Sequence, residues 1–181
     1  MLKTFLTIGS LASALLLTTA AGAQAMPTAI QKANIQAGGG WSYVRPDYGH
    51  KAVQGWAAFA DMDFGLHWGV EADIHHASLI TPEDVAENSY LIGPRFILPH
   101  GRLKLYGKGL FGIGDLVIQE RQDNVGRSPG TQFAYGLGGG VEIIASRHIV
   151  VRALDFEYQH WSYRTGLTPA VFTTGVAYRF R

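Results

Sequence analysis

The sequence predicts an all-β protein, an eight-stranded antiparallel up-and-down transmembrane β-barrel. Three observations lead to this prediction: an unusual composition, eight stretches of alternating polarity, and connections that alternate between short and long. Of the 181 residues, 47% are hydrophobic, 12% aromatic and 16% charged, and the chain contains 23 Gly and no Cys. Typical proteins contain about 25% charged residues and about 7% Gly, so this chain is poor in charge and rich in Gly.

The composition excludes several classes of protein. Gly costs about 1 kcal/mol at each interior helical position, which argues against a helical bundle. A formal net charge of +1 offers no basic surface, so we expect no nucleic-acid partner. The absence of Cys excludes disulfides, Cys nucleophiles and Cys-ligated zinc.

The N-terminus has the features of a secretory signal peptide. Lys3 precedes an apolar run through Leu17, and the small-residue site Ala23-Gln24-Ala25 follows. This run is too short for a spanning helix. We therefore expect residues 1–25 to be a cleaved signal peptide and residues 26–181 to form one barrel domain; the alternative is an N-terminal helix that is retained.

Eight stretches follow the two-residue period of a strand with two different faces. In order, they cover residues 35–43, 56–62, 68–75, 89–98, 103–113, 135–143, 149–158 and 172–180. The first two alternate less cleanly, although Trp41 and Trp56 each lie on an apolar face. The third alternates cleanly, with Trp68 and Ile74 on one face and Glu71 on the other.

The next three stretches alternate in the same way. The fourth places Tyr90 and its apolar partners opposite Arg95, and the fifth places Leu103 and its partners opposite Lys104. The sixth sets Tyr135 and other apolar residues against a series of Gly. The last stretch alternates apolar residues with Thr, Gly and Arg up to Phe180. Each of these stretches is therefore expected to be a strand with one apolar face.

The connections alternate in length. They are tight around residues 63–67, 99–102 and 145–147, and mostly longer and polar around 45–51, 76–88, 115–130 and 159–168. Short turns at one end and long loops at the other are typical of outer-membrane barrels. An even number of strands closes the sheet and removes the edges that lipid would not tolerate.

In seven stretches the face assigned as outward carries no Asp, Glu, Lys or Arg, as expected if this face meets lipid. Arg or Lys on a lipid-facing position costs roughly 2–4 kcal/mol at the bilayer midplane. The predicted inward charges of these seven stretches are Asp61, Glu71, Asp73, Arg95, Lys104, Lys108, Glu142 and Arg179, a balanced set. In the stretch 149–158, strict alternation would point Arg152 at lipid. We predict a β-bulge near Ala153–Leu154, which places Arg152, Asp155 and Glu157 inside.

An eight-stranded barrel is just wide enough inside for side chains to fill it. Together with Tyr106, the inward charges are therefore expected to close the lumen as a structural ion-pair network; the alternative is a narrow conducting pore. Outside, aromatic residues are expected to form girdles at the two membrane interfaces. The predicted girdle residues are Trp41, Tyr43, Tyr158, Trp161, Tyr163 and Tyr178.

The chain resembles the small OmpA/OmpX-type outer-membrane β-barrels, in particular a "porin family" group of unassigned function. The resemblance rests on the segments 68–72, 138–142 and 152–159, and on the terminal strand that ends at Phe180. It implies location in the outer membrane, contact with membrane lipid, and a C-terminal signal for the outer-membrane assembly machinery at Tyr178 and Phe180. Arg181 follows Phe180, whereas the resemblance implies a terminal Phe.

The expected role is non-enzymatic, structural or in surface interaction, with an extracellular partner at the loops 76–88 and 115–130. We expect a monomer without a cofactor. We also expect no metal site, because no His pair within one element has ligand spacing. A lipid A-modifying enzyme is one alternative, since His160-Trp161-Ser162 resembles a deacylase motif, but no carboxylate follows Glu157. A soluble periplasmic lipocalin-like binder is the other alternative.

Overall fold

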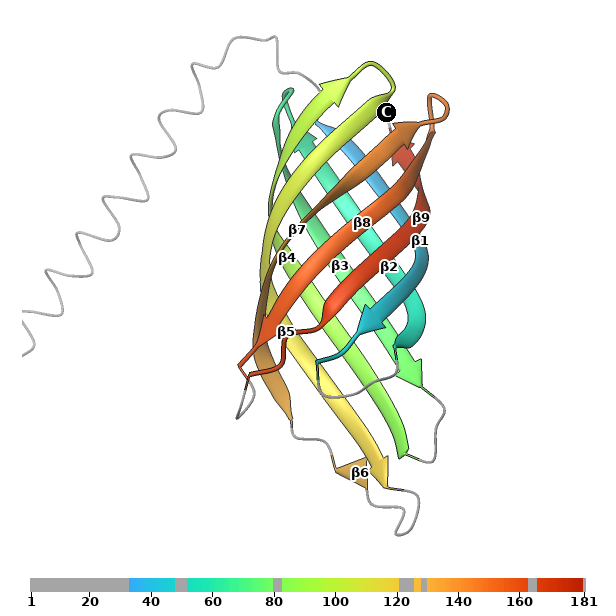
Figure 1. Cartoon of the computed structure of the whole chain (residues 1–181). Helices are drawn as coiled ribbons and strands as arrows, with labels where there is room; N and C mark the ends of the chain where they lie inside the picture. Colours follow the sequence, from blue (N-terminus) through green and yellow to red (C-terminus); the bar gives the residue numbers. More distant parts are fainter. Residues whose placement is uncertain are drawn as a thin grey trace, which may run out of the picture. The chain divides into compact units, whose positions relative to one another are not determined.

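The computed structural model describes residues 33–47, 52–79, 83–120, 126–127, 130–162 and 166–180. These residues form an antiparallel barrel of eight strands (Figure 1). The predicted signal peptide, residues 1–25, lies outside the described residues, and so does the predicted girdle residue Tyr163. The described part of the chain has no helix long and apolar enough to cross a membrane.

Closure of the sheet follows from the pairing of the first and last strands. The barrel strands are β1 (Asn34–Arg45), β2 (Val53–Phe64), β3 (Trp68–Leu79), β4 (Glu83–His100), β5 (Leu103–Glu120), β7 (Thr131–Ile144), β8 (Ile149–Trp161) and β9 (Ala170–Phe180). Each barrel strand pairs with the next, and β9 pairs with β1. The prediction of eight antiparallel strands is therefore confirmed. A two-residue strand, β6 (Gly126–Arg127), pairs with β5 beyond the barrel ring.

The outward face of the barrel is apolar and rich in aromatic rings. Exposed large side chains include Trp41, Trp56, Trp68, Tyr90, Phe111, Tyr135, Leu137, Tyr158 and Tyr178. Among the strand residues whose side chains the structure describes, charge occurs on the outward face only at Arg45 and Asp115, toward the end with the long connections. The rest of this described outward face carries no charge, as lipid requires, because charged groups at membrane depth are costly.

Several connections are shorter than the sequence predicts, because the strands continue further. Asp63 belongs to β2, and the turn that follows begins at Gly65, whose φ is +70°. The predicted loop 76–88 is mostly strand, since Leu79 of β3 pairs with Val85 of β4. The predicted loop 115–130 is also largely paired, with β5 continuing to Glu120. Beyond the membrane both faces of a pair of strands meet water, so the alternation of polarity disappears. Backbone pairing persists there, because it does not depend on the polarity of the side chains.

The predicted bulge in β8 is confirmed. Val141 of β7 pairs with Leu154 and the next residue, Glu142, pairs with Arg152, so that Ala153 is the extra residue. The register against β9 shifts at the same place. As a result Arg152 and Asp155 are both buried, although an unbroken two-residue alternation would place them on opposite faces.

Candidate functional site

The lumen is filled with charged side chains. All eleven residues of the predicted network lie inside the barrel and are buried, with exposed fractions of 7% or less: Asp61, Glu71, Asp73, Arg95, Lys104, Lys108, Glu142, Arg152, Asp155, Glu157 and Arg179. They come from β2, β3, β4, β5, β7, β8 and β9. The network therefore connects strands that are far apart in the sequence, across the inside of the barrel.

The network has one half toward the short turns, and Arg95 of β4 lies at the centre of that half. Its Nη1 atom is 2.8 Å from Asp61 Oδ2 and 3.1 Å from Glu71 Oε2. Its Nη2 atom is 3.3 Å from Glu142 Oε2. The guanidinium carbon lies 4.3 Å from the centre of the Tyr106 ring, so an aromatic face covers the cation.

Arg152 of β8 reaches the same carboxylates from the opposite wall. Its Nη2 atom is 3.1 Å from Asp61 Oδ2 and its Nη1 atom 2.9 Å from Glu71 Oε1. Glu142 Oε1 is 3.3 Å from Nη2. The Phe59 ring centre lies 3.6 Å from the guanidinium carbon. Two arginines thus share three acids, and each of these carboxylates contacts both arginines.

Lys108 of β5 holds the next layer together. Its Nζ atom lies 2.6 Å from Asp73 Oδ2 and 2.7 Å from the nearest oxygens of Glu71, Asp155 and Glu157. Tyr106 donates a hydrogen bond to Asp155 over 2.8 Å. One ammonium group therefore contacts four carboxylates, and loss of its charge would leave all four short of compensation.

Several members of the network were not predicted from the sequence, among them Asp63, Gln36 and His75. Asp63, assigned to a turn, accepts a hydrogen bond from Lys104 over 2.9 Å inside the barrel. Its position two residues after Asp61 already placed it on the inward face. Gln36 donates to Asp61 over 2.6 Å and carried no signal because it is uncharged. His75 lies two residues after Asp73 and shares its inward face, but its contact with Glu157 could not be read from the sequence.

The described lumen contains more acidic side chains than the six of the predicted network. Among the described residues, eight acidic side chains are buried: Asp61, Asp63, Glu71, Asp73, Glu87, Glu142, Asp155 and Glu157. Five basic side chains are buried with them: Arg95, Lys104, Lys108, Arg152 and Arg179. The described lumen is therefore more acidic than expected, mainly because β2 and β4 extend further than the sequence indicated.

An apolar cluster, which we call the apolar plug, fills the lumen toward the long-connection end. It consists of Leu91, Leu110, Leu116, Ala134, Trp161 and Leu167. Trp161 is only 2% exposed, so its assignment to an outer girdle is wrong; β8 continues to this residue, and alternation turns it inward. Its Nε1 donates to Gln159 Oε1 over 3.0 Å, and Gln159 donates to Glu157 over 2.8 Å. The plug and the charged network are thus connected.

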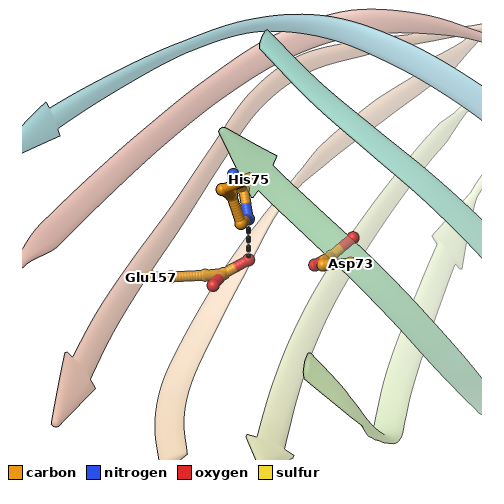
Figure 2. A group of neighbouring side chains, drawn as sticks. All are labelled: Asp73, His75 and Glu157. Atoms are coloured by element: carbon orange, nitrogen blue, oxygen red, sulfur yellow. Dashed lines mark hydrogen bonds and ion pairs between the residues drawn. The ribbon is translucent and has the colours of Figure 1, made fainter. Parts of the chain in front are cut away.

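Three side chains of the kinds that bind metal ions lie close together within the network. Figure 2 shows Asp73 and His75 from β3 facing Glu157 from β8, with His75 Nε2 3.3 Å from Glu157 Oε1. Their ligand atoms lie within 4.8 Å of one another. Lys108 Nζ, however, contacts both carboxylates at 2.6 and 2.7 Å. Its ammonium group already supplies the positive charge that a metal ion would bring.

Comparison with known protein families gives one match over nearly the whole chain. A family described as "Outer membrane protein beta-barrel domain" matches residues 11–180. Comparison with curated proteins gives no match.

Solved outer-membrane barrels have the same fold. Ail, the attachment invasion locus protein of Yersinia pestis, is 24% identical with a TM-score of 0.56, over 82% of this chain and 97% of Ail. Neisserial surface protein A is 12% identical with a TM-score of 0.67, over 82% of this chain and 97% of its own. The N-terminal barrel of Pseudomonas aeruginosa OprF is 8% identical with a TM-score of 0.52, over 83% and 99%. At these identities the likeness establishes the fold alone.

Proposed function

The chain belongs to the family of outer-membrane protein β-barrel domains and is located in the outer membrane, and from this premise we propose a closed, monomeric membrane scaffold that presents its long-connection end outside the cell. Location in the outer membrane rules out the soluble periplasmic binder. The observation that carries the proposal is the filled lumen, in which ion pairs and an apolar plug occupy the barrel from wall to wall. In this proposal the lumen neither conducts nor catalyses.

The lengths of β4 and β5 support a surface role. Each contains 18 residues, whereas a tilted strand needs about 9–11 to cross the bilayer. The two strands stay paired as far as Glu83 and Glu120, and β6 adds to this ribbon (Figure 1). A paired ribbon is a rigid platform, and loops on rigid frames commonly carry binding residues.

A shortened ribbon tests the surface role. Residues 118–127 are replaced by an Asn-Gly turn, which removes β6 and the end of β5 but keeps Leu116 of the plug. Ail has been crystallised with the heparin analogue sucrose octasulfate. Cells producing the wild-type chain and cells producing the shortened chain are therefore applied to a glycan array that includes heparin. Binding that the wild-type protein shows and the shortened protein loses supports the proposal. Equal binding by the two proteins contradicts it.

The outward aromatic rings of the terminal strand support the proposal that the outer-membrane assembly machinery recognises this strand. Tyr178 and Phe180 both point outward from β9, and their ring centres lie 5.0 Å apart. We expect Phe180→Ala to slow insertion in cells, while refolding of the purified protein into detergent stays near the wild-type rate. The measurement is the folded fraction over time after a pulse of synthesis. Equal insertion of the two proteins in cells argues against this role.

A further inference from the structure

The outward surface of β3 carries a serine and a histidine that the scaffold function does not use. His76 and Ser78 lie on the same face, and Asn88 of β4 is directly opposite His76. On the other side, Trp56 and Gln54 of β2 are opposite His76 and Ser78 respectively. His76-Ala77-Ser78 has the same spacing as His160-Trp161-Ser162.

The ring of His76 has a partner on each of the two neighbouring strands. Its Nδ1 atom forms a hydrogen bond with Asn88 Oδ1. With the amide oxygen as acceptor, Nδ1 carries the proton and the lone pair is on Nε2. The Trp56 ring stacks on the imidazole, with centroids 5.6 Å apart and planes at 30°. The ring is therefore fixed by both neighbouring strands.

Ser78 lies on the same face of β3 as His76, two residues further along the strand. Residues two apart on a strand share a face and have Cα atoms about 7 Å apart, a gap that a serine and a histidine side chain together span. Ser78 is exposed, as is Gln54 opposite it. The Gln54 amide group is a neutral donor next to the serine, which suits it to stabilise negative charge on a substrate oxygen.

The depth of these residues matches the level of lipid ester bonds. His76 is eight residues from Trp68, the aromatic residue at the short-turn end of β3. At about 3.3 Å per residue and a tilt of roughly 40°, this corresponds to about 20 Å along the membrane normal. The apolar band of such barrels is about 25 Å tall, and their long loops face outside the cell. His76 and Ser78 thus lie at the boundary between acyl chains and headgroups of the outer leaflet.

We propose that Gln54, His76, Ser78 and Asn88 form an esterase site for acyl-ester lipids of the outer leaflet. Ser78 Oγ attacks the ester carbonyl carbon while His76 Nε2 takes the hydroxyl proton. The C–O bond then breaks, and the same proton passes to the departing alcohol of the lipid. Water, activated by His76, hydrolyses the acyl-serine to a free fatty acid and restores the hydroxyl group. Asn88 acts as a positioning residue through His76.

The other His-x-Ser segment provides a matched control within the same chain. His160 packs against the Tyr135 ring with centroids 5.1 Å apart. Ser162 lies just after β8, and its backbone N–H donates to the Phe133 carbonyl. This segment has the spacing of the proposed site, while its histidine faces an aromatic ring on β7 in place of an amide.

The test uses the full chain folded in detergent micelles with lipopolysaccharide or phosphatidylethanolamine as separate substrates. Fatty-acid release is measured by mass spectrometry. We expect release from at least one lipid, loss of release in Ser78→Ala, and unchanged release in Ser162→Ala. A long-chain fluorophosphonate is expected to label Ser78. Release from lipopolysaccharide alone identifies the glycolipid as substrate, and release from phosphatidylethanolamine alone identifies the phospholipid.

Asn88 distinguishes a positioning role from a structural one. Asn88→Ala is expected to lower kcat by about 100-fold with KM little changed, and Asn88→Asp to restore most of the rate. Folding of each variant is checked by its migration on unheated gels. Absence of fatty-acid release above that of Ser78→Ala from both lipids, together with an unlabelled Ser78, would overturn the proposal.

Discussion

At the scale of single residues, Arg152 is the side chain on which the lumen depends most. Its guanidinium group contacts Asp61 of β2, Glu71 of β3 and Glu142 of β7, and so connects three strands to β8. It is 1% exposed and lies on the Phe59 ring. A buried ion pair adds little when it is compared with an apolar pair, but removal of one partner leaves the other uncompensated.

Arg152→Met should therefore destabilise the barrel strongly. The substitution keeps much of the volume but leaves three acids short of positive charge, at an expected cost of about 3–5 kcal/mol. Urea unfolding of the protein in lipid vesicles, followed by Trp fluorescence, measures the change. Arg102→Met, in an exposed turn, is the control and should shift stability by less than about 0.5 kcal/mol. Equal unfolding midpoints for Arg152→Met and wild type would contradict this role.

Gly114 tests the packing of the apolar plug. A Cβ atom at this position would lie 2.7 Å from atoms of the Trp161 ring. Gly114→Ala should cost about 1–3 kcal/mol, because the ring has to shift in a filled lumen, and Trp161→Phe in the same chain should recover part of the loss. Gly107→Ala is the control, since a Cβ there comes no closer than 3.9 Å to any atom. The same urea assay applies, and a neutral Gly114→Ala would show that the plug is loose.

Which way a side chain points was predictable from the sequence, whereas its partners were not. The two-residue period placed Arg95, Lys108 and Glu142 inside. It contained no information on which acid each base contacts, because that depends on the strand tilt and register across the lumen. Trp161 was missed for a related reason: its strand continues beyond the membrane, where polarity no longer alternates.

At the scale of elements, the bulge in β8 determines which side of the wall Arg152 occupies. Ala153 is the additional residue, and the pairing registers with β7 and β9 both shift there. The bulge was predictable because the alternative was unfavourable. Regular alternation would place Arg152 in lipid, on the other side of the wall from the acids with which it pairs. In this case the cost of exposing a charge to lipid was a stronger signal than the alternation itself.

Deletion of Ala153 should remove the bulge and keep Arg152 in the lumen. The pairs Val141–Leu154 and Glu142–Arg152 then follow each other directly, so strict alternation leaves Arg152 and Asp155 both inward. We expect a yield of folded protein in lipid vesicles close to that of the wild type, measured by migration on unheated gels. The double substitution Val151→Arg and Arg152→Val, made in the deleted chain, points the cation at lipid, at a cost of up to about 2–4 kcal/mol, and should sharply reduce that yield. Equal yields of the deleted chain with and without the double substitution would contradict the assigned role of the bulge.

The ends of the strands were the least predictable feature of the elements. The sequence located the membrane-crossing part of β4 and β5, where one face is apolar. Their continuation to Glu83 and Glu120 depends on backbone pairing between two chain segments. Backbone hydrogen bonds have no residue-type signature in water, so these segments were interpreted as loops.

At the scale of the whole molecule, the barrel has its polar groups inside and its apolar surface outside. The described lumen holds thirteen buried charged side chains, eight acidic and five basic. Among the strand residues whose side chains are described, the outward face carries charge only at Arg45 and Asp115, near the long-connection end, and lipid imposes this arrangement. The low charge content and high Gly content of the sequence follow from it, because each strand has one face in lipid and one in a narrow, crowded lumen.

The most direct test of the closed barrel is the conductance of the purified protein in planar lipid bilayers. The filled lumen predicts no unitary current steps at voltages where open porins conduct. It also predicts that opening requires disruption of the network, for example by Lys108→Met or Arg152→Met together with Trp161→Ala. Steady unitary steps in the wild-type protein, altered in ion selectivity by Glu71→Gln and Asp73→Asn, would contradict a closed lumen.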